Sequence, residues 1–198
     1  IKATMILESI LNALANAIRD TGFVSRSCGL ARFVSISSNG ANATVVKAFE
    51  APFASAEMVD ASPDGNDSAI TFFTAGATRV VRQDVWLMWC ENEVTLTMWV
   101  NGDRVDPAQS PETAVLNRIR STRVVPEEGS PIRSIEIMFA GDSNAQADIS
   151  RFGWDRPEFQ YGAYPHRIMQ MTFRVSYILS TGCSNQTMAV IPKVCERH

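Results

Sequence analysis

Apolar and polar positions recur with two different periods along the chain, and the first of these predicts a helix. Between residues 4 and 20, apolar side chains such as Ile10 and Leu14 fall on one broad face, whereas polar side chains such as Glu8 fall on the other. This is the 3.6-residue period of an amphipathic α-helix. Gly22 follows at a position where glycine commonly ends a helix. We therefore expect an N-terminal helix with one buried face.

A period of two residues predicts β-strands in much of the remaining chain. The clearest example is residues 169–179, where apolar side chains share one face and the polar side chains of residues 170, 172, 174 and 176 share the other. This polar back face indicates an antiparallel sheet with one side open to solvent or to a partner. Further extended segments are expected at residues 31–36, 43–49, 69–74, 80–83, 85–90, 94–100 and 135–141.

Residues that favour turns lie between several of these predicted strands. Asn39-Gly40 separates the first two, and this dipeptide favours the tight turn of a β-hairpin. Asn101-Gly102-Asp103 is expected to turn the chain after residues 94–100. Residues 50–68 show no periodicity and end in a stretch rich in Ser, Pro, Asp, Gly and Asn, so we expect a surface loop there.

Residues 85–122 predict a strand, a turn, a second strand and a capped helix, and they carry nothing that looks like an active site. In the second strand, at residues 94–100, the even positions are apolar and Trp99 shares the other face with two threonines, as in a half-buried strand. Ser110 is placed to cap a helix that begins at Pro111. The inner face of that helix is expected to carry Val115, Leu116 and Ile119.

The order of these elements predicts an α+β fold, with a mainly antiparallel β-sheet, an N-terminal helix and a second helix packed on it, and long loops. The 198 residues fit a single domain at 1–198, with an extended aromatic loop at about 140–166. A content of 45% hydrophobic and 20% charged residues is ordinary for a globular protein. No apolar run approaches the roughly 20 residues needed to span a bilayer, so we expect neither a transmembrane helix nor a signal peptide.

The net charge of the chain indicates which classes of partner are disfavoured. The net charge is −3, which disfavours a dedicated nucleic-acid-binding protein because such proteins neutralise phosphates with a basic stripe. Arg118, Arg120 and Arg123 gather near the end of the second predicted helix. The helix dipole stabilises basic residues near the C-terminus of a helix, and we interpret these three arginines as a solvated face.

The four cysteines, Cys28, Cys90, Cys183 and Cys195, are widely spaced and form no Cys-x-x-Cys motif. This spacing disfavours a zinc site and a dense disulfide framework. A bridge between Cys183 and Cys195 is possible, but reduced thiols are the favoured expectation.

Residues suited to catalysis are scarce. His166 and His198 are the only histidines, and His166 is expected at the edge of a strand rather than as a general base. We expect Cys90 to be a small buried apolar residue rather than a nucleophile. Asp64 and Asp67 resemble a calcium loop only faintly, because the downstream bidentate acid is missing. The sequence therefore predicts no enzyme, no catalytic residue, no cofactor and no metal.

The aromatic loop at about 140–166 is the strongest candidate for contact with a partner. Long loops without regular structure are uncommon in compact domains and are usually functional. Aromatic residues interleaved with arginines are also typical of protein interfaces. An alternative is that the rings fold back over the protein's own core, and the two roles can coexist. The candidate partner-binding residues are Phe152, Trp154, Arg156, Phe159, Tyr161 and Tyr164.

Three features follow one another along the chain. The first is the amphipathic N-terminal helix, and the second is a strand with Trp-Val-Asn at 99–101 followed by an acidic turn and a helix. The third is a late strand at 167–177 with the pattern Arg-Ile-x-x-x-Thr-Phe-x-Val-x-Tyr. This order resembles the neck and tail-completion proteins of tailed bacteriophages, including tail-terminator-like rings. The resemblance implies a structural virion protein, assembled in the bacterial cytoplasm, that forms a homo-oligomeric ring at the head–tail junction.

The same resemblance implies portal, connector, tail or collar proteins as neighbours, with no sequence-specific nucleic-acid binding and no membrane. The aromatic loop is longer than a minimal member of such a family needs. The level of the ring therefore stays open between head completion, tail terminator and another collar layer.

Two other function classes remain as alternatives. One is an antiparallel β ligand-binding module, for example a glycan-binding one, in which Trp154, Tyr161 and Tyr164 stack on the ligand. The other is an enzyme without a recognisable motif, which would gain support if Cys90 and His166 lay together in a pocket.

Overall fold

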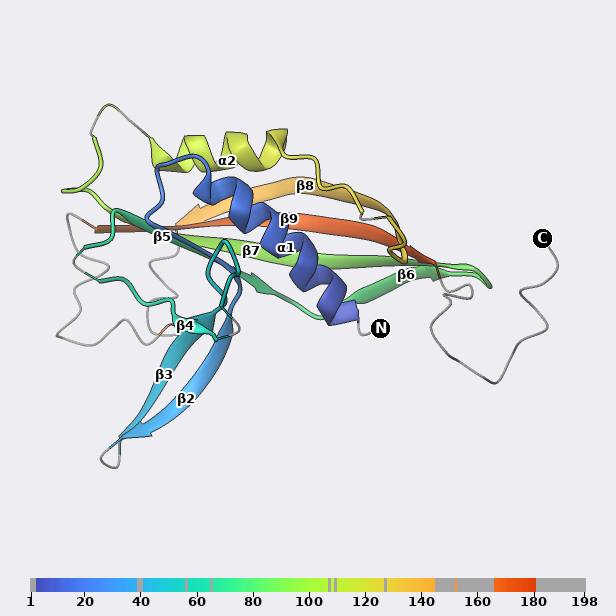
Figure 1. Ribbon diagram of the computed structural model, residues 1–198, viewed down its shortest axis with the longest axis horizontal. Helices are drawn as coiled ribbons and strands as arrows, with labels where there is room; N and C mark the ends of the chain where they lie inside the picture. Colours follow the sequence, from blue (N-terminus) through green and yellow to red (C-terminus); the bar gives the residue numbers. More distant parts are fainter. Residues whose placement is uncertain are drawn as a thin grey trace.

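The computed structural model describes residues 3–38, 41–55, 57–64, 66–106, 108, 110–126, 128–144, 152 and 166–180. Within this part of the chain the fold is α+β, as predicted (Figure 1). The helices are α1 (Ala3–Arg19) and α2 (Pro111–Ser121). The strands are β1 (Arg26–Leu30), β2 (Arg32–Ser38), β3 (Ala41–Ala48), β4 (Val59–Asp60), β5 (Ala69–Ala75), β6 (Arg79–Gln83), β7 (Leu87–Asn101), β8 (Ile132–Asn144) and β9 (His166–Ser180).

The described strands form a large sheet and a small one. The large sheet is 6-stranded with the order β1-β5-β7-β9-β8, and β6 also pairs with β7. Only the β1–β5 pairing is parallel among these, so the expectation of a mainly antiparallel sheet is confirmed. The small sheet has the order β2-β3-β4 and is antiparallel. Its β2–β3 hairpin confirms the hairpin predicted around residues 31–49, and it projects from the rest of the molecule (Figure 1).

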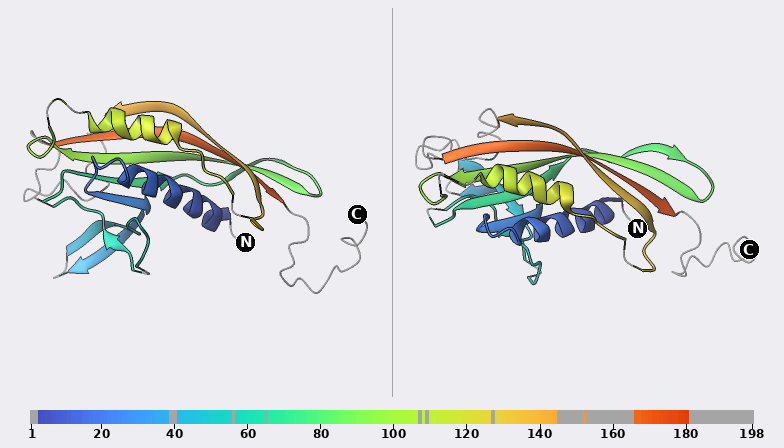
Figure 2. Two further views of the ribbon diagram at one scale, coloured as in Figure 1. Left: turned by 45° about the horizontal axis from the view of Figure 1, so that its top comes forward. Right: turned by 90° about the horizontal axis from the view of Figure 1, so that it is seen from above.

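The inner face of the large sheet is mostly apolar and carries both helices (Figure 2). Helix α1 buries Ile10, Leu11, Leu14 and Ile18 against it, which confirms the predicted amphipathic face. The alternating apolar positions of β7, β8 and β9 supply the other side of this core. Gly22 has a φ of 75°, the left-handed conformation that lets a glycine follow the end of a helix.

Helix α2 begins and ends as its sequence predicts. The Ser110 Oγ accepts a hydrogen bond from the backbone N–H of Thr113 at 3.2 Å, and Pro111 occupies the first turn. Arg118, Arg120 and Arg123 are exposed as expected, but the guanidinium of Arg120 lies 4.9 Å from the Phe139 ring, and Arg118 also makes a contact. The Nε of Arg118 donates to the carbonyl of Ala17 at 3.1 Å, so it also ties α2 to the last turn of α1.

Strand β7 corrects the sequence-based prediction, because residues 85–90 and 94–100 were expected to be separate strands. The structure has one continuous strand that pairs with β9 along 15 residues, from Leu87↔Ser180 to Asn101↔His166. The reason is Asn92, which interrupts the apolar pattern but is 1% exposed. A buried amide is tolerated in a core strand when all its hydrogen bonds are made.

The Asn92 side chain finds its partners at a bulge between β5 and β6. Its Nδ2 donates to the Gly76 carbonyl at 3.2 Å and to the Thr78 Oγ1 at 3.1 Å, and its Oδ1 accepts from the Tyr177 hydroxyl at 3.1 Å. Residues 76–78 lie opposite only residues 92–93, so the β5–β6 side carries an extra residue. The amide therefore bridges the irregularity and keeps β7 straight through it.

The outer face of the large sheet is covered at one end by the small sheet. Trp99, predicted to lie on the polar side of a half-buried strand, is 1% exposed there, so β7 is buried on both faces in this region. The covering residues come from β3 and from the segment after β4. The core of this end consists of Cys28, Ala31, Val46, Ala48, Ala61, Ile70, Phe72, Trp99, Phe152 and Ile168.

Candidate interaction surfaces

The two ends of the outer face differ in what covers them. At the end away from the small sheet, no described helix or strand lies over β7, β8 and β9. The outward-facing side chains of these strands are exposed or half-buried there. Cross-strand pairing places these side chains in rows: Trp89 opposite Ile178, Glu91 opposite Ser176, and Glu93 opposite Arg174. We call this surface the open half, and it comprises Trp89, Glu91, Glu93, Ser134, Glu136, Met138, Arg174, Ser176 and Ile178.

The open half is hollowed and carries charges of both signs. A hollow of about 210 Å³ is lined by residues that include Trp89, Glu136 and Ile178. Glu91 and Glu136 flank Ser176 on the neighbouring strands. Arg174 lies 3.6 Å from the carboxylate of Glu91, whereas Glu136 makes no ion pair with any described residue. On the neighbouring strand β6, Arg79 lies opposite Glu91, and the guanidinium of Arg82 lies 4.6 Å from the Trp89 ring. With these two residues the face has as many arginines as carboxylates, so Glu136 is the carboxylate suited to a basic group of a partner.

Strands β2 and β3 form a two-sided hairpin, which we call the arm. Antiparallel partners point to the same side, so Phe33 and Val46 share one face while Val34, Val45 and Ile36 share the other. The first face points to the molecule's own core, since Val46 is fully buried and the Phe33 ring, although 38% exposed, stacks on that of Phe152 at 6.1 Å. The other face points outward, and Val34 and Ile36 are 37% and 39% exposed.

The outward face of the arm also carries basic residues. Arg32 pairs with Lys47 across the hairpin and lies on the same side as Val34. Residues 32–48 contain no Asp or Glu. At the base of the arm, Arg32 lies 3.8 Å from Glu8, and Asp60 is paired with Lys47. An exposed ion pair at this distance contributes little, so the arm remains an apolar and basic surface.

A second apolar protrusion lies at the β6–β7 turn, beside the open half (Figure 1). Val81, Val85 and Trp86 are 57%, 75% and 46% exposed. The turn is held by Asp84, whose Oδ1 accepts from the backbone N–H groups of Trp86 and Leu87 at 2.9 and 2.7 Å. These two hydrogen bonds hold the pKa of Asp84 below its usual value. The turn therefore presents its apolar side chains from a defined conformation.

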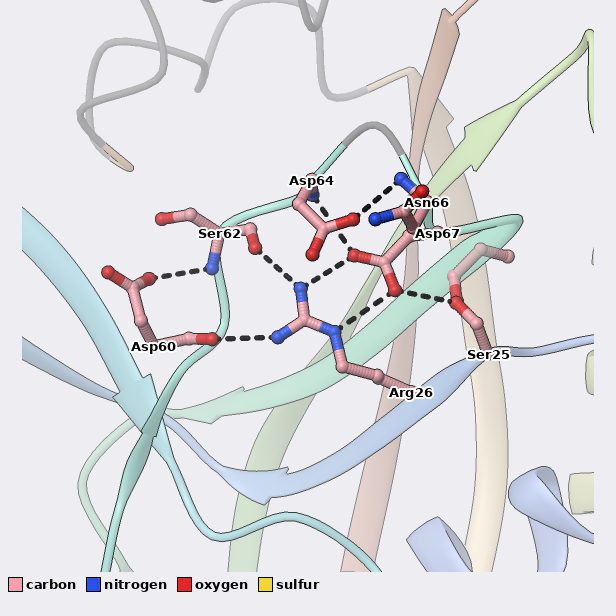
Figure 3. Close-up of polar contacts among 8 residues, drawn as sticks. Ser25, Arg26, Asp60, Ser62, Asp64, Asn66 and Asp67 are labelled. Carbon is pink, nitrogen blue, oxygen red and sulfur yellow. Dashed lines mark hydrogen bonds and ion pairs between the residues drawn. The ribbon is translucent and has the colours of Figure 1, made fainter.

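The base of the arm is anchored by Arg26 (Figure 3). Its guanidinium donates to the Asp67 carboxylate at 2.7 and 3.1 Å, to the Asp60 carbonyl at 2.9 Å and to the Ser62 carbonyl at 2.6 Å. Asp60 belongs to β4 and Arg26 to β1, so this residue joins the small sheet to the large one. The carboxylate of Asp67 is occupied by the guanidinium, which fits a structural loop better than a calcium loop.

Asp67 has a lowered pKa for reasons visible in the same cluster. Burial of the carboxyl raises the pKa, but hydrogen bonds from Arg26, from the backbone N–H of Asp64 and from the Ser25 hydroxyl outweigh burial. The distances from Asp67 to the Asp64 nitrogen and to the Ser25 Oγ are 3.0 and 2.9 Å. The charged form of Asp67 is therefore the form that the fold stabilises.

The predicted partner-binding residues are only partly placed. Phe152 is 1% exposed and lies in the core under the small sheet, with its ring 5.4 Å from that of Phe72 in an edge-on arrangement. For this residue the structure has the self-packing arrangement. Trp154, Arg156, Phe159, Tyr161 and Tyr164 lie outside the described residues.

The residues weighed for catalysis do not come together. His166 pairs with Asn101 at one end of the β7–β9 ladder, and its ring lies 5.0 Å from that of Trp99. Cys90 pairs with Tyr177 towards the other end. Cys90 is 2% exposed, and burial raises the pKa of its thiol. Burial also raises the pKa of Cys28 to about 12, so both thiols are protonated and poor nucleophiles at neutral pH.

The outward face of the arm and the β6–β7 turn were missed by the sequence reasoning, although a signal was present. Phe33-Val34, Val80-Val81 and Val85-Trp86 are neighbouring apolar pairs in or beside strands. Successive side chains of a strand point to opposite faces, so such a pair presents apolar surface on both sides. In a two-stranded hairpin, one of those sides has no core to cover it.

Among the described residues, no group of three or more His, Cys, Asp or Glu side chains is arranged to hold a metal ion. No helix in the described ranges has the length and apolar character to cross a membrane. Comparison with known proteins adds no relative: no family model, no curated protein and no solved structure matches this chain.

Proposed function

We propose that this chain is a non-enzymatic assembly subunit whose copies associate head to tail into a closed ring. The observation that carries the proposal is the presence of two different apolar protrusions, the arm and the β6–β7 turn, in different parts of the molecule (Figure 1). Isolated exposed apolar side chains are ordinary, but clusters of them mark interaction sites. Two unlike surfaces suit a heterologous contact, which forms a ring when the rotation between copies closes.

The setting we propose is the virion of a tailed bacteriophage, at the level of a neck connector or a tail terminator. The order of elements that carries this resemblance is supported by the order in the fold: helix α1, then strand β7 ending at Trp99-Val100-Asn101, then α2, then β9. Neighbouring rings of portal, connector, tail or collar proteins would be further partners. Catalysis plays no part in this proposal, since His166 and Cys90 are far apart in the β7–β9 register.

Imaging tests the proposal directly. The purified chain is examined by mass photometry and negative-stain electron microscopy, and the native particle by cryo-electron microscopy. We expect closed rings with a single copy number in the particle and the same contacts, at least weakly, in the purified chain. A chain that is monomeric at every concentration and absent from virions would contradict the proposal.

A pair of matched variants makes this test specific. Val85 and Val125 are both strongly exposed, at 75% and 66%, but only Val85 lies in an apolar protrusion. Val85→Asp is expected to weaken ring formation because it places a charge in the contact. Val125→Asp is the control and should leave ring formation unchanged. Equal effects of the two variants would show that general surface polarity, rather than the β6–β7 turn, controls association.

A further inference from the structure

We propose that the outward face of the arm of one copy packs on the open half of the next copy. This inference rests on the proposed function and specifies where the arm of one copy lies on the next copy: on the open half, beside the β6–β7 turn. It commits to a second copy of this chain as the occupant of the open half. The partner side chains are Arg32, Val34, Ile36, Val45 and Lys47 on the arm. They would contact the open half around Trp89, Glu91, Glu136 and Ile178.

Chemical complementarity is the first argument. The arm presents Val34 and Ile36 next to a basic end and carries no acidic residue between positions 32 and 48. The open half presents Trp89 and Ile178 side by side, with the guanidinium of Arg82 over the Trp89 ring. Glu136 is exposed and has no ion-pair partner among the described residues. Apolar surface thus meets apolar surface, and the basic end of the arm meets the carboxylate of Glu136.

The size of the two surfaces is the second argument. With a rise of about 3.4 Å per residue, the 7 residues of β2 extend about 24 Å. The open half spans the rows from Trp89 to Glu93 across neighbouring strands that are about 4.8 Å apart. A two-stranded hairpin is long enough to cross this surface, and sheet faces pack on each other at about 10 Å. The hollow of about 210 Å³ offers room for a side chain of the arm.

The way the chain covers its own sheet is the third argument. The inward face of the arm already contributes to a sheet-on-sheet core with the covered end, where Val46 lies in one core with Phe72 and Trp99. The outward face would make the same kind of contact with the uncovered end of the same sheet in another copy. One hairpin would then lie between two large sheets. Because its two faces are different, each copy has one free arm face and one free open half, and the chain of contacts continues.

Cross-linking between two variants that each carry one added, accessible cysteine tests this contact even if association is weak. Both carry Cys183→Ser and Cys195→Ser, and the native Cys28 and Cys90 are buried. One variant has Ile36→Cys on the arm and the other has Ser176→Cys in the open half. The two are mixed in equal amounts, treated with a short bifunctional maleimide and analysed by denaturing gel and mass spectrometry. The matched control replaces Ser176→Cys with Asn117→Cys, an exposed position on α2.

We expect the 36–176 heterodimer at a yield at least about tenfold above the 36–117 control, because a specific contact raises the local concentration of the two thiols. Arg32→Glu in the arm variant should lower the yield several-fold, and Glu136→Arg in the other variant should restore it. A 36–176 yield equal to the control would overturn the inference. If the unmodified chain still forms rings in that case, the proposed function survives and only the surfaces are wrong, whereas the absence of rings overturns both.

Discussion

The two ends of the outer face of the large sheet differ although they share their strands. Trp99 and Trp89 lie on the same face of β7, but Trp99 is 1% exposed under the small sheet while Trp89 lies in the open half. The covered end is apolar, with Ile70 and Ile168 in the rows beside Trp99. The open half mixes Trp89, Met138 and Ile178 with charged residues; Trp, Met and Arg are enriched in protein interfaces, whereas Glu is depleted there. On our proposal, the covered end stabilises the monomer and the open half serves association.

The largest expected effect comes from the two tryptophans. Trp99→Ala should lower the free energy of unfolding by about 3–5 kcal/mol, because it leaves a cavity in a close-packed core. Trp89→Ala should lower it by less than about 1 kcal/mol, chiefly through the lost contact with the guanidinium of Arg82, which lies 4.6 Å from the ring. Urea denaturation of the purified variants measures both values.

For ring formation, we expect Trp89→Ala to have a larger effect than Trp99→Ala. Trp89→Ala is expected to weaken ring formation in mass photometry, while the folded fraction of Trp99→Ala should retain the open half and its contacts. Comparable losses of unfolding free energy in the two variants would mean that the open half is part of the monomer's core. The comparison between the two ends would then fail.

The next effect concerns the anchor of the small sheet. Asp67→Asn should lower the free energy of unfolding at pH 7 by about 1.5–3 kcal/mol, because Arg26 loses its charged partner. The folded pKa of Asp67 is lowered, so its contribution is present above the ordinary aspartate pKa of about 3.9 and is lost as the pH falls through the folded value. The difference between wild type and variant should therefore shrink below about pH 4.

Stability measured against pH provides the check. Asp103→Asn is the control, since Asp103 is exposed, and it should leave the acid limb of the profile unchanged. If Asp67→Asn retains its full effect at pH 2.5, the cause is not the charge of this carboxylate.

Asn92 lies at the boundary between the two ends, and its replacement should have a comparable or smaller effect. Asn92→Ala is expected to lower the free energy of unfolding by about 1–3 kcal/mol, because Gly76, Thr78 and Tyr177 lose a buried partner. Tyr177→Phe removes only one of these hydrogen bonds and should lower it by about 0.5–1.5 kcal/mol. Hydrogen exchange should quicken in β6 and the first half of β7 for Asn92→Ala, and uniform quickening across the sheet would contradict this role.

The smallest effect is expected at the cap of α2, on the helix-covered side. Ser110→Ala removes the acceptor for the Thr113 N–H and should lower the free energy of unfolding by about 1 kcal/mol. Ring formation should be unchanged, since α2 lies on the inner face. A loss of association in Ser110→Ala would place a contact surface on the helical side.

The elements with long regular patterns were predictable from the sequence, and the exceptions have physical causes. α1 and β9 span 17 and 15 residues, and the regular patterns at residues 4–20 and 169–179 predicted the greater part of both. β4 has 2 residues, and β1 has 5 and includes Gly29, where a Cβ would meet the side chain of Asn12. No local pattern identifies strands this short.

The sequence also could not predict which residues are buried by segments that are distant in the chain. The sequence of β7 shows that Trp99 faces away from the helices, but its burial depends on residues 46–61 folding over it. The continuity of β7 likewise depends on Asn92 meeting a bulge formed by residues 76–78. Among the candidate contact residues, Phe152 could be recognised as aromatic but not assigned to the core, because Phe33 and Phe72 come from other strands.

Mixing two one-sided variants tests the central claim most directly. Ile36→Asp blocks the arm, and Ile178→Asp blocks the open half; Glu136→Arg replaces the latter if thermal unfolding shows that Ile178→Asp is not folded. Each variant alone should be monomeric in mass photometry, and an equal mixture should form dimers and nothing larger, because only one contact remains intact. Mixtures that stay monomeric while the wild-type chain forms rings, or single variants that still form rings, would contradict the account.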